Sequence, residues 1–457
     1  MAQLLTICEE WSQLAGMKFA PQKCVVLGPS IAARQVPLKL YNTDLPSAEQ
    51  ATYLGIPFTR AGIAWKALCK ERTDKAADVI RALAPMGLNA RGWAPAAAAR
   101  VYKTFIRPVM EYGLALSCNL SAECVQRYER TQALALRTIC SAPRNTSYNG
   151  LRRLLQIEPM SHRIKLVNIQ WAARLHSSGD KGNIAVHLYH NAIRTIAPTA
   201  RRELPLPLVA RSNPLWQQSE LGDMPPLVAD GTGAKPRKPL TDEVKLTLRR
   251  QSICILDNPN DTGAIANTIQ VELDDPVRPF LQANGKLSRE DRWILLQWIL
   301  GSVTRHEQCK HCPEPEMTRV HAALCSGADE DLSSQFPEDT PQHPRHTRID
   351  AVLNKYRNST GDHAAYKACV AAIQKILVKC RGLRRRKRDG FWTSEPDSDD
   401  DDDNNNNNIN SQVIPVVAEA LPPTVASQRQ TQRNAAISLR RNRPRGRPRR
   451  PPSNDAG

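Results

Sequence analysis

The first 63 residues show a helical hydrophobic pattern followed by short apolar runs. Leu4, Ile7, Trp11 and Leu14 recur at three- and four-residue spacing, which places them on one face of a helix. The runs that follow are each bounded by Pro, Gly or Asn, as is typical of strands. They occupy residues 17–19, 24–27, 38–40 and 53–58. The pattern therefore predicts one helix and then a few short strands.

A helical pattern dominates from residue 64 to residue 176. One apolar stripe contains Val125, Tyr128, Leu136 and Ile139, and a second contains Ile164, Val167, Trp171 and Leu175. Eight prolines then lie between Pro198 and Pro239. Because proline removes a backbone donor and fixes φ, this stretch cannot sustain long helices or central strands. We expect a boundary between two folded parts here.

The second folded part is expected to be small and helical. Thr241 is a candidate N-cap for a helix to about Leu256, and the apolar run from Arg289 to Leu300 predicts another helix. A last amphipathic helix carries Tyr366, Val370, Ile373 and Leu377 on one face and ends at Cys380. Beyond it come five consecutive aspartates and five consecutive asparagines, a composition that buries too little surface to fold.

Charge is distributed unevenly along the chain. Its 457 residues include 63 Lys and Arg against 45 Asp and Glu. The basic residues outnumber the acidic ones by 23 to 11 in residues 1–176, by 25 to 24 in residues 177–380 and by 15 to 10 in residues 381–457. Cations at both ends suit a polyanion such as nucleic acid, because dispersed contacts gain from counterion release. No stretch approaches the roughly 18 apolar residues of a spanning helix, so we expect no membrane insertion.

Metal-binding residue types cluster between residues 309 and 325. The N-terminus has no features of a secretion signal, so the twelve cysteines are expected to be reduced and, where clustered, to bind metal. The spacing C-x2-C-x8-H-x3-C is formed by Cys309, Cys312, His321 and Cys325. A C-x2-C turn and an H-x3-C helix face can converge on a tetrahedral Zn²⁺ ion. We expect a closed structural zinc site, in which His306 or His311 is an alternative to His321. Cysteines that merely fill a core are the other interpretation.

An arginine-rich motif lies near the C-terminus. Arg445, Gly446, Arg447 and Pro448 form a core in which the glycine leaves two guanidinium groups on one narrow edge. Arginines so arranged favour narrow A·T-rich minor grooves, where negative potential is concentrated. The motif resembles an AT-hook. A basic tail that binds any polyanion is the alternative.

A second basic run follows the last predicted helix. It consists of Arg381 and residues 384–388. Such a run is typical of a nuclear-localisation signal or of phosphate contacts. An ordinary solvated helix end is the other interpretation.

Carboxylates suited to two-metal catalysis are scarce. The only aspartates in residues 1–176 are Asp44, Asp74 and Asp78, whereas two-metal chemistry needs converging carboxylates. Asp74 and Asp78 share a helix face, but Lys and Arg residues surround them, and we interpret the face as solvated and charged. The chain also lacks a G-x-S-x-G motif, a P-loop and a dinucleotide-binding glycine motif. We predict no catalytic residues.

Several short motifs follow one another in a fixed order. A helix end from Leu14 to Cys24, which includes Lys23, precedes Leu54-Gly55. Residues 100–113 and 129–132 then lie in the helical part, and Trp298 to Gly301 precedes the cysteines. Over about residues 1–180 and 290–330 these motifs resemble the C-terminal part of the reverse transcriptases of non-LTR (LINE-type) retrotransposons. The resemblance implies palm motif D around Lys23 and the primer grip, motif E, at Leu54 and Gly55. Nucleic-acid contacts are therefore expected at these three residues.

The resemblance also implies what the chain lacks. The family's palm holds its metal-binding aspartates in motif A and in an Ala-Asp-Asp box, and both precede the position that matches Met1. We therefore expect no polymerase activity from this chain, and a role for Mg²⁺ only if such a palm were present. The Cys/His spacing differs from the retroviral C-x2-C-x4-H-x4-C knuckle, so it implies only a structural zinc fold.

The expected fold class is mainly α, with a small α/β palm remnant, a thumb-like helical domain, a zinc-stabilised helical module and a disordered tail. The expected parts are a palm remnant at 1–60, the thumb-like domain at 61–180, a Pro-rich linker or irregular lobe at 181–245, the Cys/His zinc module at 246–345, an amphipathic helix ending in a basic cluster at 346–388, and the tail with the hook at 389–457.

The expected function is nucleic-acid binding in the nucleus, as a fragment of an RNA-directed DNA polymerase that is itself inactive. RNA and DNA are the expected partners, with template-primer-like duplexes bound by the basic helical part and A·T-rich DNA by the tail. The C-terminal helix is a candidate contact for a protein partner. The alternative is a domesticated nuclear DNA-binding scaffold that uses the zinc module and the AT-hook.

Overall fold

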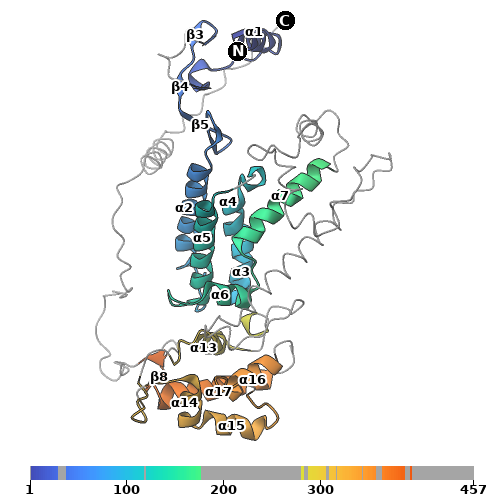
Figure 1. Ribbon diagram of the computed structural model, residues 1–457. Helices are drawn as coiled ribbons and strands as arrows, with labels where there is room; N and C mark the ends of the chain where they lie inside the picture. The colour runs from blue at the N-terminus through green and yellow to red at the C-terminus, as the bar shows by residue number, and fades with distance from the viewer. Residues whose placement is uncertain are drawn as a thin grey trace, which may run out of the picture. The chain divides into compact units, whose positions relative to one another are not determined.

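The computed structural model describes residues 2–28, 38–117, 120–176, 279–282, 287–304, 308–314, 316–341, 343–356, 363–385 and 392–393. These residues are mainly helical, with a few very short strands (Figure 1). They belong to one compact unit, Met1–Asp397. The prediction of a mainly α fold is confirmed in this coarse form. The predicted linker, the helix from Thr241, the tail and the hook lie outside the described residues.

The N-terminal segment contains the predicted helix, α1 (Ala2–Leu14), and small paired strands. Strands β1 (Val26–Leu27) and β4 (Ser47–Ala48) pair in parallel, and β2 (Lys39–Leu40) and β3 (Thr43–Asp44) pair antiparallel. The Tyr41 backbone N–H, in the β2–β3 turn, donates to Glu9 Oε1 at 2.5 Å, which ties α1 to this hairpin. The apolar stripe of α1 is more than half exposed at all four positions. The predicted strand at 17–19 was wrong, because these residues form no strand.

A three-stranded antiparallel sheet follows, in the order β5 (Gln50–Tyr53), β6 (Ile56–Thr59) and β7 (Gly62–Ile63). The predicted single run at 53–58 is instead a hairpin that turns at Leu54 and Gly55. Both turn residues have positive φ, +48° and +74°. A two-residue turn of this kind matches the right-handed twist of the flanking strands, and Gly55 adopts it without a steric penalty.

The helical pattern after residue 64 is confirmed. The elements are α2 (Trp65–Leu83), α3 (Pro95–Val101), the π-helical turn η3 (Tyr102–Ile106), α4 (Arg107–Glu111), α5 (Ala122–Cys140), α6 (Tyr148–Leu155) and α7 (Met160–His176), with the 3-10 turn η4 (Leu114–Leu116). On the α5 stripe, Tyr128, Leu136 and Ile139 are buried. Asp74 and Asp78 pair with Arg127 and Arg81 at 2.7 and 2.8 Å, so the interpretation of a charged surface face was correct.

The segment after residue 279 is a helical cluster around one central helix. Its elements are η6 (Pro279–Leu281), α13 (Arg289–Ile299), α14 (Arg319–Ser326), α15 (Ala328–Gln335), α16 (Arg348–Lys355), α17 (His363–Lys379) and the strands β8 (Arg384–Arg385) and β9 (Trp392–Thr393). The helices α13, α14, α15 and α16 all pack against α17. The predicted face of α17 is buried at all four positions. The region predicted as one helix ending in a basic cluster, 346–388, instead contains α16, α17 and strand β8.

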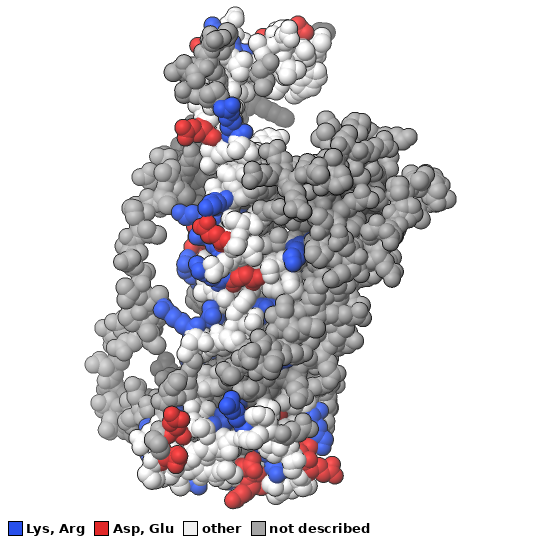
Figure 2. Space-filling model, in the orientation of Figure 1, with Lys and Arg blue, Asp and Glu red and all other residues white. Residues whose placement is uncertain are grey.

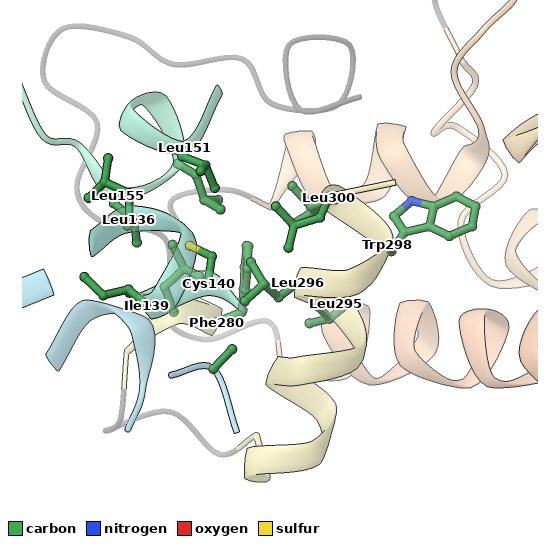
Figure 3. Close-up of a cluster of buried hydrophobic side chains, with 14 of the residues drawn as sticks. Leu136, Ile139, Cys140, Leu151, Leu155, Phe280, Leu295, Leu296, Trp298 and Leu300 are labelled. Carbon is green, nitrogen blue, oxygen red and sulfur yellow. The ribbon is translucent and has the colours of Figure 1, made fainter. Parts of the chain in front are cut away.

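Buried apolar side chains from both helical segments form one cluster. Figure 3 shows Leu136, Ile139 and Cys140 of α5 on one side and Leu296 and Leu300, at the end of α13, on the other. The Arg91 guanidinium lies 5.3 Å from the centre of the Trp293 ring and adds a cation–π contact between the two segments. Within the described ranges, no helix is both long enough and apolar enough to cross a bilayer.

Candidate metal centre

The four predicted metal ligands lie together at the start of the helical cluster. Cys309 and Cys312 lie in a bend between α13 and α14, and His321 and Cys325 lie four residues apart on α14. Thr318 caps α14 by accepting from the His321 backbone N–H at 3.1 Å, and this fixes the first turn of the helix. The prediction that both halves of the motif face one point is confirmed. The ligand atoms all lie within 4.8 Å of one another.

The distances within this group fit a tetrahedral ion. Zinc–sulfur bonds of about 2.3 Å at tetrahedral angles place two sulfurs about 3.8 Å apart. The Sγ of Cys325 lies 3.8 Å from the Sγ of Cys309 and 3.8 Å from that of Cys312. Cys312 Sγ lies 3.3 Å from His321 Nε2. Three thiols and one imidazole at these distances could hold a metal ion such as zinc, with all four tetrahedral positions filled by protein.

The thiols of the group differ in their pKa. Desolvation opposes ionisation of Cys309, but hydrogen bonds from His321 and from backbone N–H groups outweigh it and lower the pKa of this thiol to about 6. Desolvation and the neighbouring thiols raise the pKa of Cys325 to about 11. The opposite directions belong together, because a charge on Cys309 disfavours a second charge on the nearby Cys325. A divalent cation would remove this conflict by stabilising every thiolate.

The geometry favours His321 over the two alternative histidine ligands, His306 and His311. His321 is the histidine of the four-residue group. His311 lies on the turn itself, with its Nδ1 3.5 Å from Cys325 Sγ, so it contacts the group from the solvent side. His306 lies outside the described residues.

Two features that the sequence did not reveal hold the centre in place. The buried Cys380, just after α17, lies beneath α14, with its Sγ 3.7 Å from the Ala322 carbonyl oxygen. Its own carbonyl accepts from the Lys310 backbone N–H at 2.9 Å. Arg319, two residues before His321, pairs with Asp350 of α16 at 3.4 Å and donates to the Ile299 carbonyl at the end of α13 at 3.1 Å. The metal turn, residues 309–312, is thus attached to the end of α17, and α14 is attached to α13 and α16.

The predicted nucleic-acid residues Leu54 and Gly55 form the tip of the β5–β6 hairpin. The side chains of Tyr53 and Leu54 are 68% and 71% exposed. The Tyr112 hydroxyl donates to the Leu54 carbonyl at 2.5 Å, and the Arg72 guanidinium donates to the Gly55 carbonyl at 2.5 Å. Arg72 also stacks 4.3 Å from the centre of the Tyr112 ring. Arg72 was not singled out from the sequence, because nothing in the local pattern separates it from its charged neighbours.

Of the other predicted nucleic-acid contacts, Lys23 alone lies within the described residues. Lys23 is exposed at the end of η1 (Pro21–Lys23). Arg445, Gly446, Arg447 and Pro448 lie outside the described residues.

The basic surplus of residues 1–176 is partly neutralised on the surface. Over α2 and α5, Figure 2 shows Lys and Arg interspersed with Asp and Glu, and Lys66 pairs with Glu123 at 3.0 Å.

Comparisons with known proteins assign no family to this chain. No family model matches it, and it matches neither a curated protein nor a solved structure. Its function must therefore be argued from the residues.

Proposed function

We propose that this chain binds nucleic acid as part of a LINE-type reverse transcriptase, with residues 1–60 acting as a palm remnant, residues 61–180 as a thumb, and the Cys309–Cys325 group as a structural zinc site. The proposed partners are RNA and DNA, and the proposed compartment is the nucleus. The AT-hook reading of Arg445 to Pro448 adds a preference for A·T-rich DNA.

The observation that carries the proposal is a contact between two motifs, made by residues that lie 58 positions apart in the sequence. Leu54-Gly55 resembles a primer grip, and residues 100–113 resemble a thumb helix. Tyr112, at the end of that second motif, holds the carbonyl of Leu54. Arg72 holds the carbonyl of Gly55. The two motifs of the resemblance therefore form one structural unit, as a primer-binding hairpin supported by a thumb would require.

The chemistry of the hairpin tip also supports the proposal. The backbone carbonyls of Leu54 and Gly55 accept hydrogen bonds from Tyr112 and Arg72, and these bonds hold the tip in place on the helices. Its outward side chains are an aromatic ring and a leucine, which can pack against the sugar and base edge of a strand end. Aromatic stacking on a base contributes about 1–3 kcal/mol without regard to sequence.

A binding experiment with matched leucines tests the proposal. Full-length protein is titrated with an RNA–DNA duplex that has a recessed 3′ end and with the same duplex made blunt. We expect Leu54→Ala to weaken binding to the recessed duplex more than to the blunt one. Leu324→Ala, which removes a leucine 61% exposed in the zinc module, is the control and should change neither.

Two results would overturn parts of the proposal. Failure of the unaltered protein to bind any nucleic acid at 50 mM salt would remove the function itself. Equal behaviour of Leu54→Ala and Leu324→Ala would remove the hairpin from the binding surface.

In the tail, Arg445→Ala with Arg447→Ala should reduce binding to A·T-rich duplex selectively. An equal loss of affinity for G·C-rich duplex would mean that the tail is only a polycation.

A further inference from the structure

The described part of the basic run after α17, Arg381 with Arg384 and Arg385, forms a chain reversal and a short strand, so this part is not the solvated end of a helix. The helix stops at Lys379, and Gly382 then adopts φ +59°. Gly382 N–H donates to the Val378 carbonyl and Leu383 N–H to the Leu377 carbonyl, both at 3.0 Å, so the chain reverses at the helix end. Leu383 packs against the buried cluster. Arg384 and Arg385 then pair antiparallel with Thr393 and Trp392 as strands β8 and β9.

The metal turn lies against this reversal. The Lys310 backbone N–H, between the two cysteines of the C-x2-C turn, donates to the Cys380 carbonyl at 2.9 Å. A Cβ placed on Gly382 would lie 3.2 Å from Lys310 Cδ and 3.9 Å from its Nζ, so the lysine side chain runs directly over the glycine. Arg381 donates to the Ser302 carbonyl at 3.3 Å and fixes the same segment to the end of α13. Lys310 therefore lies against Gly382, two residues before Arg384 in the chain, although the two cations are 74 residues apart in the sequence.

Both of these cations are available to a ligand. Lys310 and Arg384 are exposed. In the part of the chain that the structure describes, no carboxylate oxygen lies within 4.0 Å of either charged group. By contrast, Lys375, further back on α17, is paired with Asp331 at 2.7 Å. Two exposed cations on segments that contact each other, followed in the sequence by a basic stretch, are suited to a polyanion.

We propose that Lys310 of the metal turn and Arg384 of strand β8 form one phosphate-binding surface for the backbone of a nucleic acid, which the metal centre holds in shape. This inference rests on the proposed function and names a second contact region for it. An import receptor that takes up a basic run as an extended chain would have to separate β8 from β9. Phosphates can be bound while β8 and β9 stay paired, which favours nucleic acid.

The test is the salt dependence of binding by the full chain. Each phosphate contact contributes about 0.9 to the slope of log K against log salt, which amounts to about eightfold in affinity at 0.1 M relative to 1 M salt. Lys310→Gln with Arg384→Gln should therefore lower the slope by about 1.8 and the affinity at 0.1 M salt by about 60-fold. Lys310→Arg with Arg384→Lys should retain most of both. Metal content, measured in parallel, should be the same in all variants.

Lys367→Gln is the matched control, because this lysine is exposed on α17 three turns before its end. It should leave the slope unchanged. If Lys367→Gln lowers the affinity as much as Lys310→Gln or Arg384→Gln alone, only net charge matters and the inference is overturned. Unchanged affinity of the double variant would also overturn it, as would a loss of nuclear import with unchanged nucleic-acid affinity. If the unaltered protein binds no nucleic acid, the proposed function is wrong, and the surface that rests on it is overturned as well.

Discussion

The buried carboxylate of Asp350 allows a sharp test of what holds the metal module together. Its side chain is 1% exposed. One oxygen accepts from Trp298 Nε1 at 2.9 Å and from Arg319 at 3.4 Å. The other accepts from the backbone N–H and the hydroxyl of Thr347 at 3.0 and 2.9 Å, which makes Asp350 part of the capping box of α16. One residue therefore connects α13, α14 and α16.

The expected cost of removing it follows from these contacts. Asp350→Ala leaves the Arg319 guanidinium, whose side chain is 12% exposed, without its counter-charge, and breaking a buried pair costs about 3–5 kcal/mol. The indole N–H of Trp298 is left unsatisfied, which adds about 1–3 kcal/mol. Because the two terms share the same cavity and do not add fully, we expect a loss of about 4 kcal/mol. Asp350→Asn should cost less, because one acceptor oxygen remains for Trp298.

The assay is urea denaturation of the metal-loaded protein, with Asp331→Ala as the control. Asp331 also pairs with a cation, Lys375 at 2.7 Å, but both side chains are about half exposed. Such pairs contribute about 0–1 kcal/mol. Since Arg319 lies on α14 with two of the ligands, Asp350→Ala should also speed the transfer of metal to a chelator, whereas Asp331→Ala should not. Equal effects of the two alanines on unfolding would refute the role of the buried network.

Three further predictions concern other parts of the molecule. Purified protein should contain about one equivalent of zinc by metal analysis, and Cys309→Ser or Cys325→Ser should lose both the metal and the cooperative melting of the module, whereas Cys8→Ser should lose neither. Glu129→Ala should lower the free energy of unfolding by about 2 kcal/mol, because its carboxylate caps the first N–H groups of α7, and exposed Glu123→Ala should cost less than half as much in the same denaturation series. Desolvation lowers the pKa of His346 below 6.5 in the folded protein, so its contribution to stability is present above pH 6.5 and is lost as pH falls. An NMR titration of His346 with its midpoint above 6.5 would contradict the assigned environment.

Local features of this fold could be predicted from the sequence, because they depend on neighbours in the chain. The C-x2-C and H-x3-C spacings are set by one turn and one helix face, and the ligands do converge. The face of α17 was read from a 3.6-residue period, and its four residues are buried. The same period correctly predicted the helix α1, but the apolar stripe of this helix is exposed. Periodicity shows that a face exists and does not show what covers it.

Contacts between distant residues could not be predicted, because the fold alone selects the partners. Nothing near Arg72 indicates that its guanidinium reaches the carbonyl of Gly55. Nothing near Trp298 indicates a carboxylate 52 residues later. The run at 53–58 was read as one strand because Leu54 is apolar, whereas its positive φ makes it a turn residue. The only local sign of that turn was Gly55.

The structure also separates the motifs that maintain the fold from those free to act on a ligand. Within residues 129–132, Glu129 caps α7, and the buried Gln132 accepts from Tyr102 at 2.7 Å and donates to Tyr148 at 2.9 Å. These side chains are committed to the interior, so likeness to a thumb at this point concerns architecture and says nothing of nucleic acid. Tyr53, Leu54 and Lys23 are exposed, and their side chains are not required by the core. Substitutions at exposed residues of this kind can change nucleic-acid binding without changing the helical fold. For this reason the binding experiments alter the hairpin tip and the cations beside the metal turn.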